Sequence, residues 1–66
     1  MKGTVKWFSE AKGFGFISPD EGGRDLYFQR GSLSTPDHTL TEGQRVEFEV
    51  TKGTKGPEAI EIHIVE

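Results

Sequence analysis

The fold of this 66-residue chain is decided by the stretch Lys12-Gly13-Phe14-Gly15-Phe16-Ile17. Successive side chains of a β-strand point to opposite faces, so Phe14 and Phe16 share one face and Ile17 takes the other. Gly15 lies opposite the two rings, where a missing side chain lets a strand coil sharply. The alternation predicts a strand over residues 12–18 with one aliphatic face and one aromatic face.

A second segment, over residues 25–30, alternates in the same way. Leu26 and Phe28 share one face and Tyr27 takes the other. A chain this short can bury only a small core, so only one of the two sets can enter it. We expect Ile17 to lie inside with Leu26 and Phe28. The rings that then face water are Phe14, Phe16 and Tyr27.

Period-two alternation also predicts a strand over residues 2–9 and two more strands near the end of the chain. The apolar residues assigned to the core in the last two strands are Val46, Phe48 and Val50, then Ile60, Ile62 and Ile64. The stretch between Gly31 and Gly43 is not periodic, and it is predicted to hold a short helical turn around Ser32 and Leu33. Five short antiparallel strands leave no open edge if they close, which predicts an all-β barrel forming one domain over residues 1–66.

Composition limits what the protein can bind. Eight Lys and Arg residues against eleven Asp and Glu residues give a net charge of −3, which argues against a purely electrostatic grip on a polyanion. The absence of cysteine excludes disulfides and fits a reducing cytoplasm. No run approaches the roughly 18 apolar residues of a membrane span, and the N-terminus does not resemble a signal peptide. We therefore expect an unprocessed cytoplasmic protein with no membrane partner.

Catalysis is not indicated either. The carboxylates are spread over exposed strand faces, with no cleft that would raise a pKa, and no catalytic triad can be assembled. His63 falls on the wet face of the last strand, and two histidines without cysteine give little support for a metal site. The sequence predicts no enzyme, no catalytic residue, no cofactor, no metal and no small-molecule substrate.

The exposed rings indicate a binding surface instead. Trp7 and Phe8 add to them on the first strand, beside Lys6. Every nucleobase can stack on an aromatic ring, which contributes about 1–3 kcal/mol per base with little sequence preference. The cations that could contact phosphates are Lys6, Lys12, Arg30 and Lys55.

Two placements stay open at this point. A bulge in the first strand could reverse the faces of its residues, and Phe8 could be a stacking residue or a partly buried structural one. Alternatively, Phe14 and Phe16 form the core of an ordinary barrel that binds nothing.

The stretch from Lys12 to Ile17 also matches an RNA-binding signature that occurs on two folds. One of them, the RNA recognition motif, needs two helices, and no segment here has helical periodicity. The signature is preceded by Gly3-Thr4-Val5-Lys6-Trp7-Phe8, and Gly53-Thr54-Lys55-Gly56-Pro57 comes before the last strand. With these segments the whole chain resembles the bacterial cold-shock proteins.

This resemblance implies a five-stranded antiparallel OB-fold-type β-barrel that binds single-stranded DNA or RNA and acts as an RNA chaperone on weak secondary structure. The binding residues that it implies are Lys6, Trp7, Phe8, Lys12, Phe14, Phe16 and Tyr27, with Lys55 in the last loop. Asp25 matches a polar position at the start of the third strand. A monomer is expected, although an exposed barrel edge would permit a domain-swapped dimer.

The chain departs from the family pattern after Phe28. Gln29 and Arg30 stand where the family has a stacking histidine and a stacking aromatic residue. Gln29 can bond a base edge, and Arg30 can stack or reach a phosphate, so we expect weaker and more salt-sensitive binding. His38 lies in a loop that lacks the family's exposed ring, where it either stacks or stays solvated.

These losses leave two other functions open. In one, the same aromatic patch binds a protein partner. In the other alternative, the chain folds as a barrel but has no binding function. The retained Trp7, Phe14 and Phe16 argue against this alternative.

Overall fold

The computed structural model describes residues 1–35, 39–53 and 56–65. Its elements in chain order are β1 (Lys2–Ser9), β2 (Phe14–Pro19), β3 (Leu26–Gln29), the 3₁₀ helix η1 (Arg30–Ser32), β4 (Arg45–Gly53) and β5 (Gly56–Ile64). The short helical turn expected after the third strand is therefore present as η1. Within the described ranges, no helix has the length and apolar character needed to cross a membrane.

Strand β2 begins two residues later than predicted. Gly13 has a φ of +77°, a left-handed conformation that suits glycine, and its N–H donates to the Ser9 carbonyl at 2.8 Å. Residues 10–13 therefore form the turn between β1 and β2, and the strand starts at Phe14.

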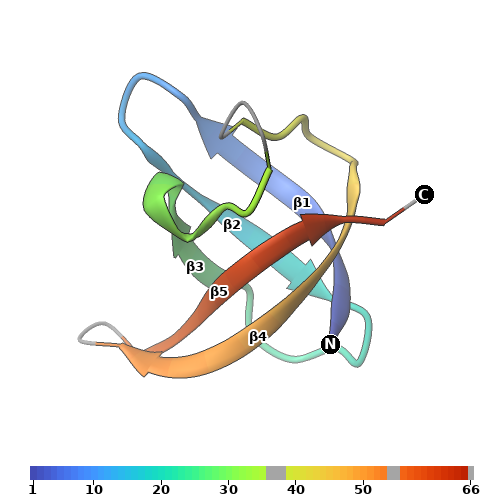
Figure 1. Cartoon of the computed structure of the whole chain (residues 1–66). Helices are drawn as coiled ribbons and strands as arrows, with labels where there is room; N and C mark the ends of the chain where they lie inside the picture. The colour runs from blue at the N-terminus through green and yellow to red at the C-terminus, as the bar shows by residue number, and fades with distance from the viewer. Residues whose placement is uncertain (36–38, 54–55, 66) are drawn as a thin grey trace.

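The five strands form a closed barrel in the order β1-β2-β3-β5-β4 (Figure 1), which confirms the predicted architecture. Four of the neighbouring pairs are antiparallel. The fifth pair, β3 with β5, is parallel and joins Tyr27 to Glu58. A ring of five strands cannot alternate direction at every contact, so one parallel pair is unavoidable.

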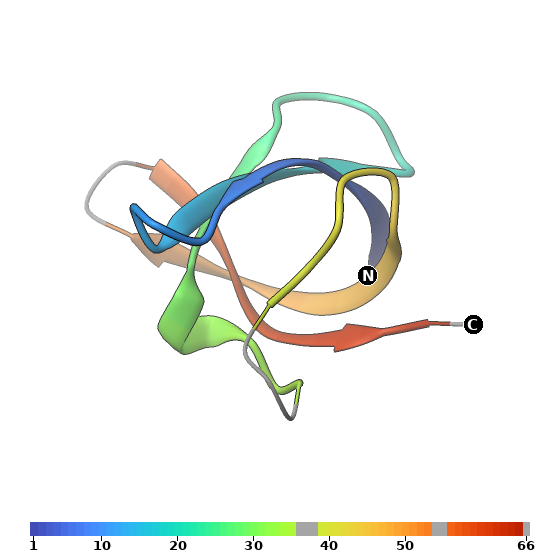
Figure 2. The same cartoon turned by 90° about the horizontal axis from the view of Figure 1, so that it is seen from above.

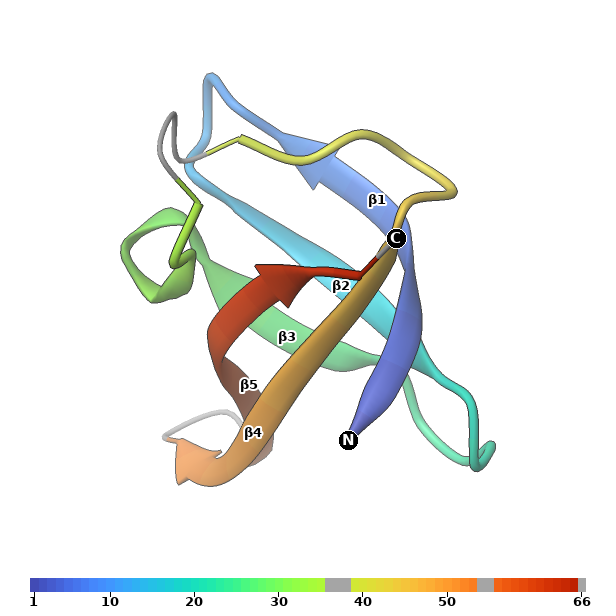
Figure 3. The same cartoon turned by 45° about the vertical axis from the view of Figure 1, so that its right-hand side comes forward.

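The core lies inside the closed barrel. Figure 2 shows the strands from above, and in Figure 3 β4 crosses in front of β2. Ile17, Leu26 and Phe28 are all buried, as the alternation of β2 and β3 predicted. The other buried apolar residues are Val5, Leu33, Leu40, Val46, Phe48, Ala59 and Ile62.

The predicted alternation of the last strand is wrong because β5 contains a bulge. The register with β4 shifts by one residue, so that Glu61 and Ile62 together lie opposite one residue of β4. Glu61 takes a φ of +50°, which is uncommon for a residue with a side chain. As a result Ala59 and Ile62 both reach the core, while Ile60 is only partly buried and Ile64 is 42% exposed.

Val50 was also predicted to be a core residue, and this is wrong. Its partner in β5, Ala59, is fully buried, but Val50 itself is 41% exposed. It lies with Pro19, Leu26 and Pro57 around a shallow hollow on the surface. The barrel ends here, so the inward face of β4 opens to solvent.

An ion pair ties the turn after β2 to the start of β4. Arg45 donates from its two terminal nitrogens to the Asp20 carboxylate at 2.6 and 2.5 Å, and also to the Thr4 hydroxyl at 3.1 Å. Hydrogen bonding to Arg45 holds the pKa of Asp20 below its ordinary value, and the carboxylate raises the pKa of Arg45. The pair joins segments that are far apart in the sequence.

Candidate nucleic-acid interface

Four aromatic rings gather on the outer surface of β1, β2 and β3. We call this set the aromatic face; its members are Trp7, Phe14, Phe16 and Tyr27. Neighbouring ring centroids lie between 5.3 and 6.3 Å apart, the spacing of interacting aromatic pairs. Trp7 is 37% exposed and the other three rings are partly exposed. A cluster of aromatic rings in contact with water indicates a binding surface.

A bulge in β1 turns Trp7 outward. Val5 pairs with Ile17, but Trp7 pairs with Phe16, so Lys6 is an extra residue in this ladder. Strict alternation would place Val5 and Trp7 on the same face. Because of the extra residue, Val5 is buried while both Lys6 and Trp7 are exposed. The reversal left open in the sequence does occur, and it joins Trp7 to the rings of β2.

Close contact between β1 and β2 keeps the rings of β2 on the outside. A methyl group added at Gly15 would overlap the main chain of Trp7 and Phe8 and the ring of Phe28. Gly15 therefore has no room for a side chain on the inner face, which fits the architectural role predicted for it. The two bulky neighbours of Gly15, Phe14 and Phe16, point the other way.

Phe8 lies on the core side of the barrel. Its ring stacks on the buried ring of Phe28, with centroids 5.6 Å apart and an interplanar angle of 17°. Phe8 is partly buried and packs against the core cluster. Of the two roles left open for this residue, the contact supports the structural one.

Lys6 is held by a carboxylate beside the aromatic face. Its Nζ lies 2.7 Å from Oδ2 of Asp25, and the two side chains are 62% and 33% exposed. An ion pair this exposed contributes little to stability, so a phosphate can compete with Asp25 for the ammonium group. Lys12 lies in the exposed turn between β1 and β2, where its N–H donates to the Ser9 hydroxyl at 3.2 Å.

Gln29 and Arg30 lie at the end of β3, beside the aromatic face. Gln29 pairs with Phe14 across the sheet, and its Nε2 donates to the Tyr27 hydroxyl at 3.4 Å. The N–H of Arg30 donates to the Gly13 carbonyl at 2.8 Å, which places this exposed residue next to the β1–β2 turn. Both residues that depart from the family pattern therefore border the rings.

Two of the predicted site residues, His38 and Lys55, lie outside the described residues. One charged residue that borders the aromatic face, Glu58, was not predicted from the sequence. Glu58 pairs with Tyr27 across the parallel contact between β3 and β5. No local signal in the sequence reveals this pairing, because it depends on how the barrel closes.

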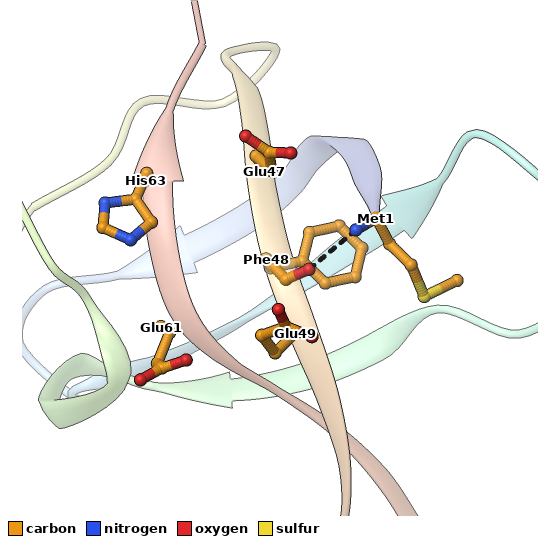
Figure 4. Close-up of a pocket in the computed structure, with 6 residues that line it drawn as sticks. All are labelled: Met1, Glu47, Phe48, Glu49, Glu61 and His63. Carbon is orange, nitrogen blue, oxygen red and sulfur yellow. Dashed lines mark hydrogen bonds between the residues drawn. The ribbon is translucent and has the colours of Figure 1, made fainter.

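A second concave patch lies on β4 and β5, and it has a different character. It encloses about 240 Å³ and is lined by Met1, Glu47, Phe48, Glu49, Glu61 and His63. Figure 4 shows the Met1 nitrogen donating to the Phe48 carbonyl, at 2.9 Å, and His63 is exposed as predicted. In the described part of the chain, His, Cys, Asp and Glu side chains form no group of three or more that could hold a metal ion. The carboxylates of this patch disfavour a polyanion, which leaves the aromatic face as the candidate interface.

Comparison with known proteins gives a consistent result. Residues 1–65 match the family described as the 'Cold-shock' DNA-binding domain. The chain is 52% identical over 63 residues to the cold shock-like protein CspE of Escherichia coli K12, covering 94% of this chain and 91% of that protein. It is 54% identical over 63 residues to the cold shock-like protein CspA of Vibrio cholerae, covering 94% and 90%.

A solved structure of Drosophila Unr, comprising CSD456, has the same fold over nearly the whole chain. The TM-score is 0.83 at 26% sequence identity, and the match covers 98% of this chain and 26% of the Unr chain.

Proposed function

This chain belongs to the cold-shock domain family of nucleic-acid-binding domains, and we propose that it binds single-stranded DNA or RNA by stacking bases on its aromatic face. The observation that carries the proposal is the cluster of four partly exposed rings on adjacent strands. Stacking contributes about 1–3 kcal/mol per base, so several rings together outweigh the repulsion from a net charge of −3. Bases in a duplex are already stacked and paired, which favours the single strand.

The roles of the residues follow from their positions. We assign base stacking to the four rings of the aromatic face and assign Phe8 to the support of Phe28. Gln29 lies close enough to Phe14 and Tyr27 to bond the edge of a stacked base. The proposed phosphate contacts are Lys6, Lys12, Arg30 and Lys55, and His38 is a further candidate for stacking. None of these roles involves catalysis.

We further propose that binding melts weak secondary structure in RNA. A protein that binds only the unpaired form of a hairpin shifts the equilibrium toward that form by its differential binding free energy. The process needs neither ATP nor covalent chemistry, so only hairpins of low stability are expected to open. A cytoplasmic location and a monomeric state stay predictions.

The proposal is tested through Trp7, the single tryptophan of the chain. We would titrate the folded protein with oligo(dT) and with a matched duplex, at low and high salt, and follow tryptophan fluorescence. Strong quenching by the single strand alone, weakened by salt, is the expected result. Absence of quenching with both ligands would contradict the proposal and favour a protein partner for the aromatic face.

A further inference from the structure

On β5, the residue next to the aromatic face is a glutamate, Glu58. One row of directly paired residues crosses four strands, because Trp7 pairs with Phe16, Phe16 with Tyr27 and Tyr27 with Glu58. Paired residues of neighbouring strands point to the same face of a sheet, and neighbouring strands lie about 4.8 Å apart. Ala59, the next residue of β5, is fully buried, so Glu58 points outward. The row of three rings therefore ends at Glu58.

Glu58 is available to a ligand. Its side chain is partly exposed, and a methyl group added at Gly53 would overlap its Oε2, so the carboxylate lies over the end of β4. Within the described residues, no cation or hydrogen-bond donor is paired with it. The negative charge at this position repels the phosphates of a bound strand. Binding therefore favours a nucleotide whose base donates hydrogen bonds to the carboxylate.

We propose that Glu58 reads the base stacked on Tyr27 and selects guanine there. This inference rests on the proposed function and adds a base preference to it. An ionised carboxylate only accepts hydrogen bonds, and guanine presents two adjacent donors, N1–H and N2–H, that match its two oxygens. Such charge-assisted bonds are stronger than neutral ones.

The other bases fit the carboxylate less well. Adenine and cytosine offer one exocyclic amino group next to an acceptor nitrogen. In thymine and uracil the single N–H lies between two carbonyl oxygens. The carboxylate repels these oxygens, because both groups are hydrogen-bond acceptors. We therefore expect guanine to bind best and thymine or uracil to bind worst at this one position of the strand.

The test compares oligo(dT) heptamers that carry one guanine at each position in turn. Affinity is measured by fluorescence anisotropy of a labelled strand. The expected result is one position at which guanine binds about tenfold more tightly than thymine. Inosine at the same position lacks the N2 amino group, so its affinity should fall between the two. In the Glu58→Gln variant, an NH2 donor replaces one of the two acceptor oxygens. This variant should reduce the guanine preference at least fivefold.

Glu49→Gln is the matched control, because Glu49 is an exposed carboxylate of the patch on β4 and β5 (Figure 4). It makes the same change in net charge and should keep the preference. Thermal melting checks that both variants are folded. Equal affinity for guanine and thymine at every position would overturn the inference, as would an unchanged preference in Glu58→Gln. In both of these outcomes the protein still binds single strands. If the unmodified protein bound no single strand at all, the proposed function itself would be refuted.

Discussion

At the scale of single residues, Phe8 and Phe14 are the same residue type with different roles, because one packs on the core and the other lies in the aromatic face. The ring of Phe8 stacks on the buried Phe28, and the ring of Phe14 contacts Trp7 and Tyr27 in the aromatic face. The first contact adds to the core, while the second leaves a ring surface in water. Replacing each residue should therefore affect a different property.

We expect Phe14→Ala to weaken single-strand binding by about five- to 150-fold, since one stacking ring contributes about 1–3 kcal/mol. Its melting temperature should change little. Phe8→Ala should instead lower the free energy of unfolding by about 2 kcal/mol, because it empties space next to the core. Fluorescence anisotropy and thermal melting measure the two effects. The assignment is wrong if Phe8→Ala lowers affinity in a fully folded sample as much as Phe14→Ala does.

A second prediction concerns the ion pair of Lys6 with Asp25. Asp25→Asn frees the ammonium group for phosphate, so the affinity for a single strand should rise. The slope of log K against log salt should steepen by about 0.7, the value for one more phosphate contact. Stability should change by less than about 1 kcal/mol, because the pair is exposed. In a Lys6→Gln background, Asp25→Asn should leave the slope unchanged; an effect there would show that Lys6 is not the group released.

At the scale of the elements, a bulge in each of two strands interrupts the alternation of inward and outward side chains. The bulge in β1 sends both Lys6 and Trp7 outward, and the bulge in β5 brings Ile62 into the core. Each adds one residue to one strand of an antiparallel pair and increases the local twist, which helps a short strand follow the barrel. The bulge in β5 carries a cost, since Glu61 has a φ of +50°.

Glu61→Gly should therefore stabilise the barrel, by about 1 kcal/mol, since glycine takes a left-handed conformation without the clash of a Cβ atom. Glu61→Ala removes the same charge but keeps the Cβ atom. Denaturant unfolding of the two variants separates the backbone effect from the charge effect. Equal stabilities of the glycine and alanine variants would show that the backbone of residue 61 is not strained.

At the scale of the whole molecule, the barrel separates two kinds of surface. The aromatic face covers β1 to β3, while the carboxylates of Glu47, Glu49 and Glu61 lie on β4 and β5. This separation lets an acidic protein offer a polyanion one favourable side. The ion pair of Asp20 with Arg45 joins the two parts of the barrel.

This ion pair predicts a dependence of stability on pH. The pKa of Asp20 is lower in the folded protein than its ordinary value of 3.8, because Arg45 bonds the carboxylate. The stabilisation is therefore fully present above the ordinary pKa and is lost as the pH falls through the folded one. Asp20→Asn should lower the melting temperature at pH 7, and the difference from the unmodified protein should vanish in stronger acid. Glu21→Gln, in the same exposed turn, is the control and should show no such difference.

The sequence by itself determined the strands and most of their faces. The burial of Ile17, Leu26 and Phe28, and with it the outward position of Phe14, Phe16 and Tyr27, could be predicted because side-chain alternation is a local property of a strand. Closure into a five-stranded barrel followed from the number of strands and the absence of helical periodicity.

Only the tertiary structure decided the rest. The outward position of Trp7, the exposure of Ile64, the pairing of Lys6 with Asp25 and the place of Glu58 beside Tyr27 all depend on register between separate strands. Register is set by how the whole barrel closes, with bulges that shift it by one residue. A shift of one residue moves a side chain to the other face, so local patterns cannot fix these positions.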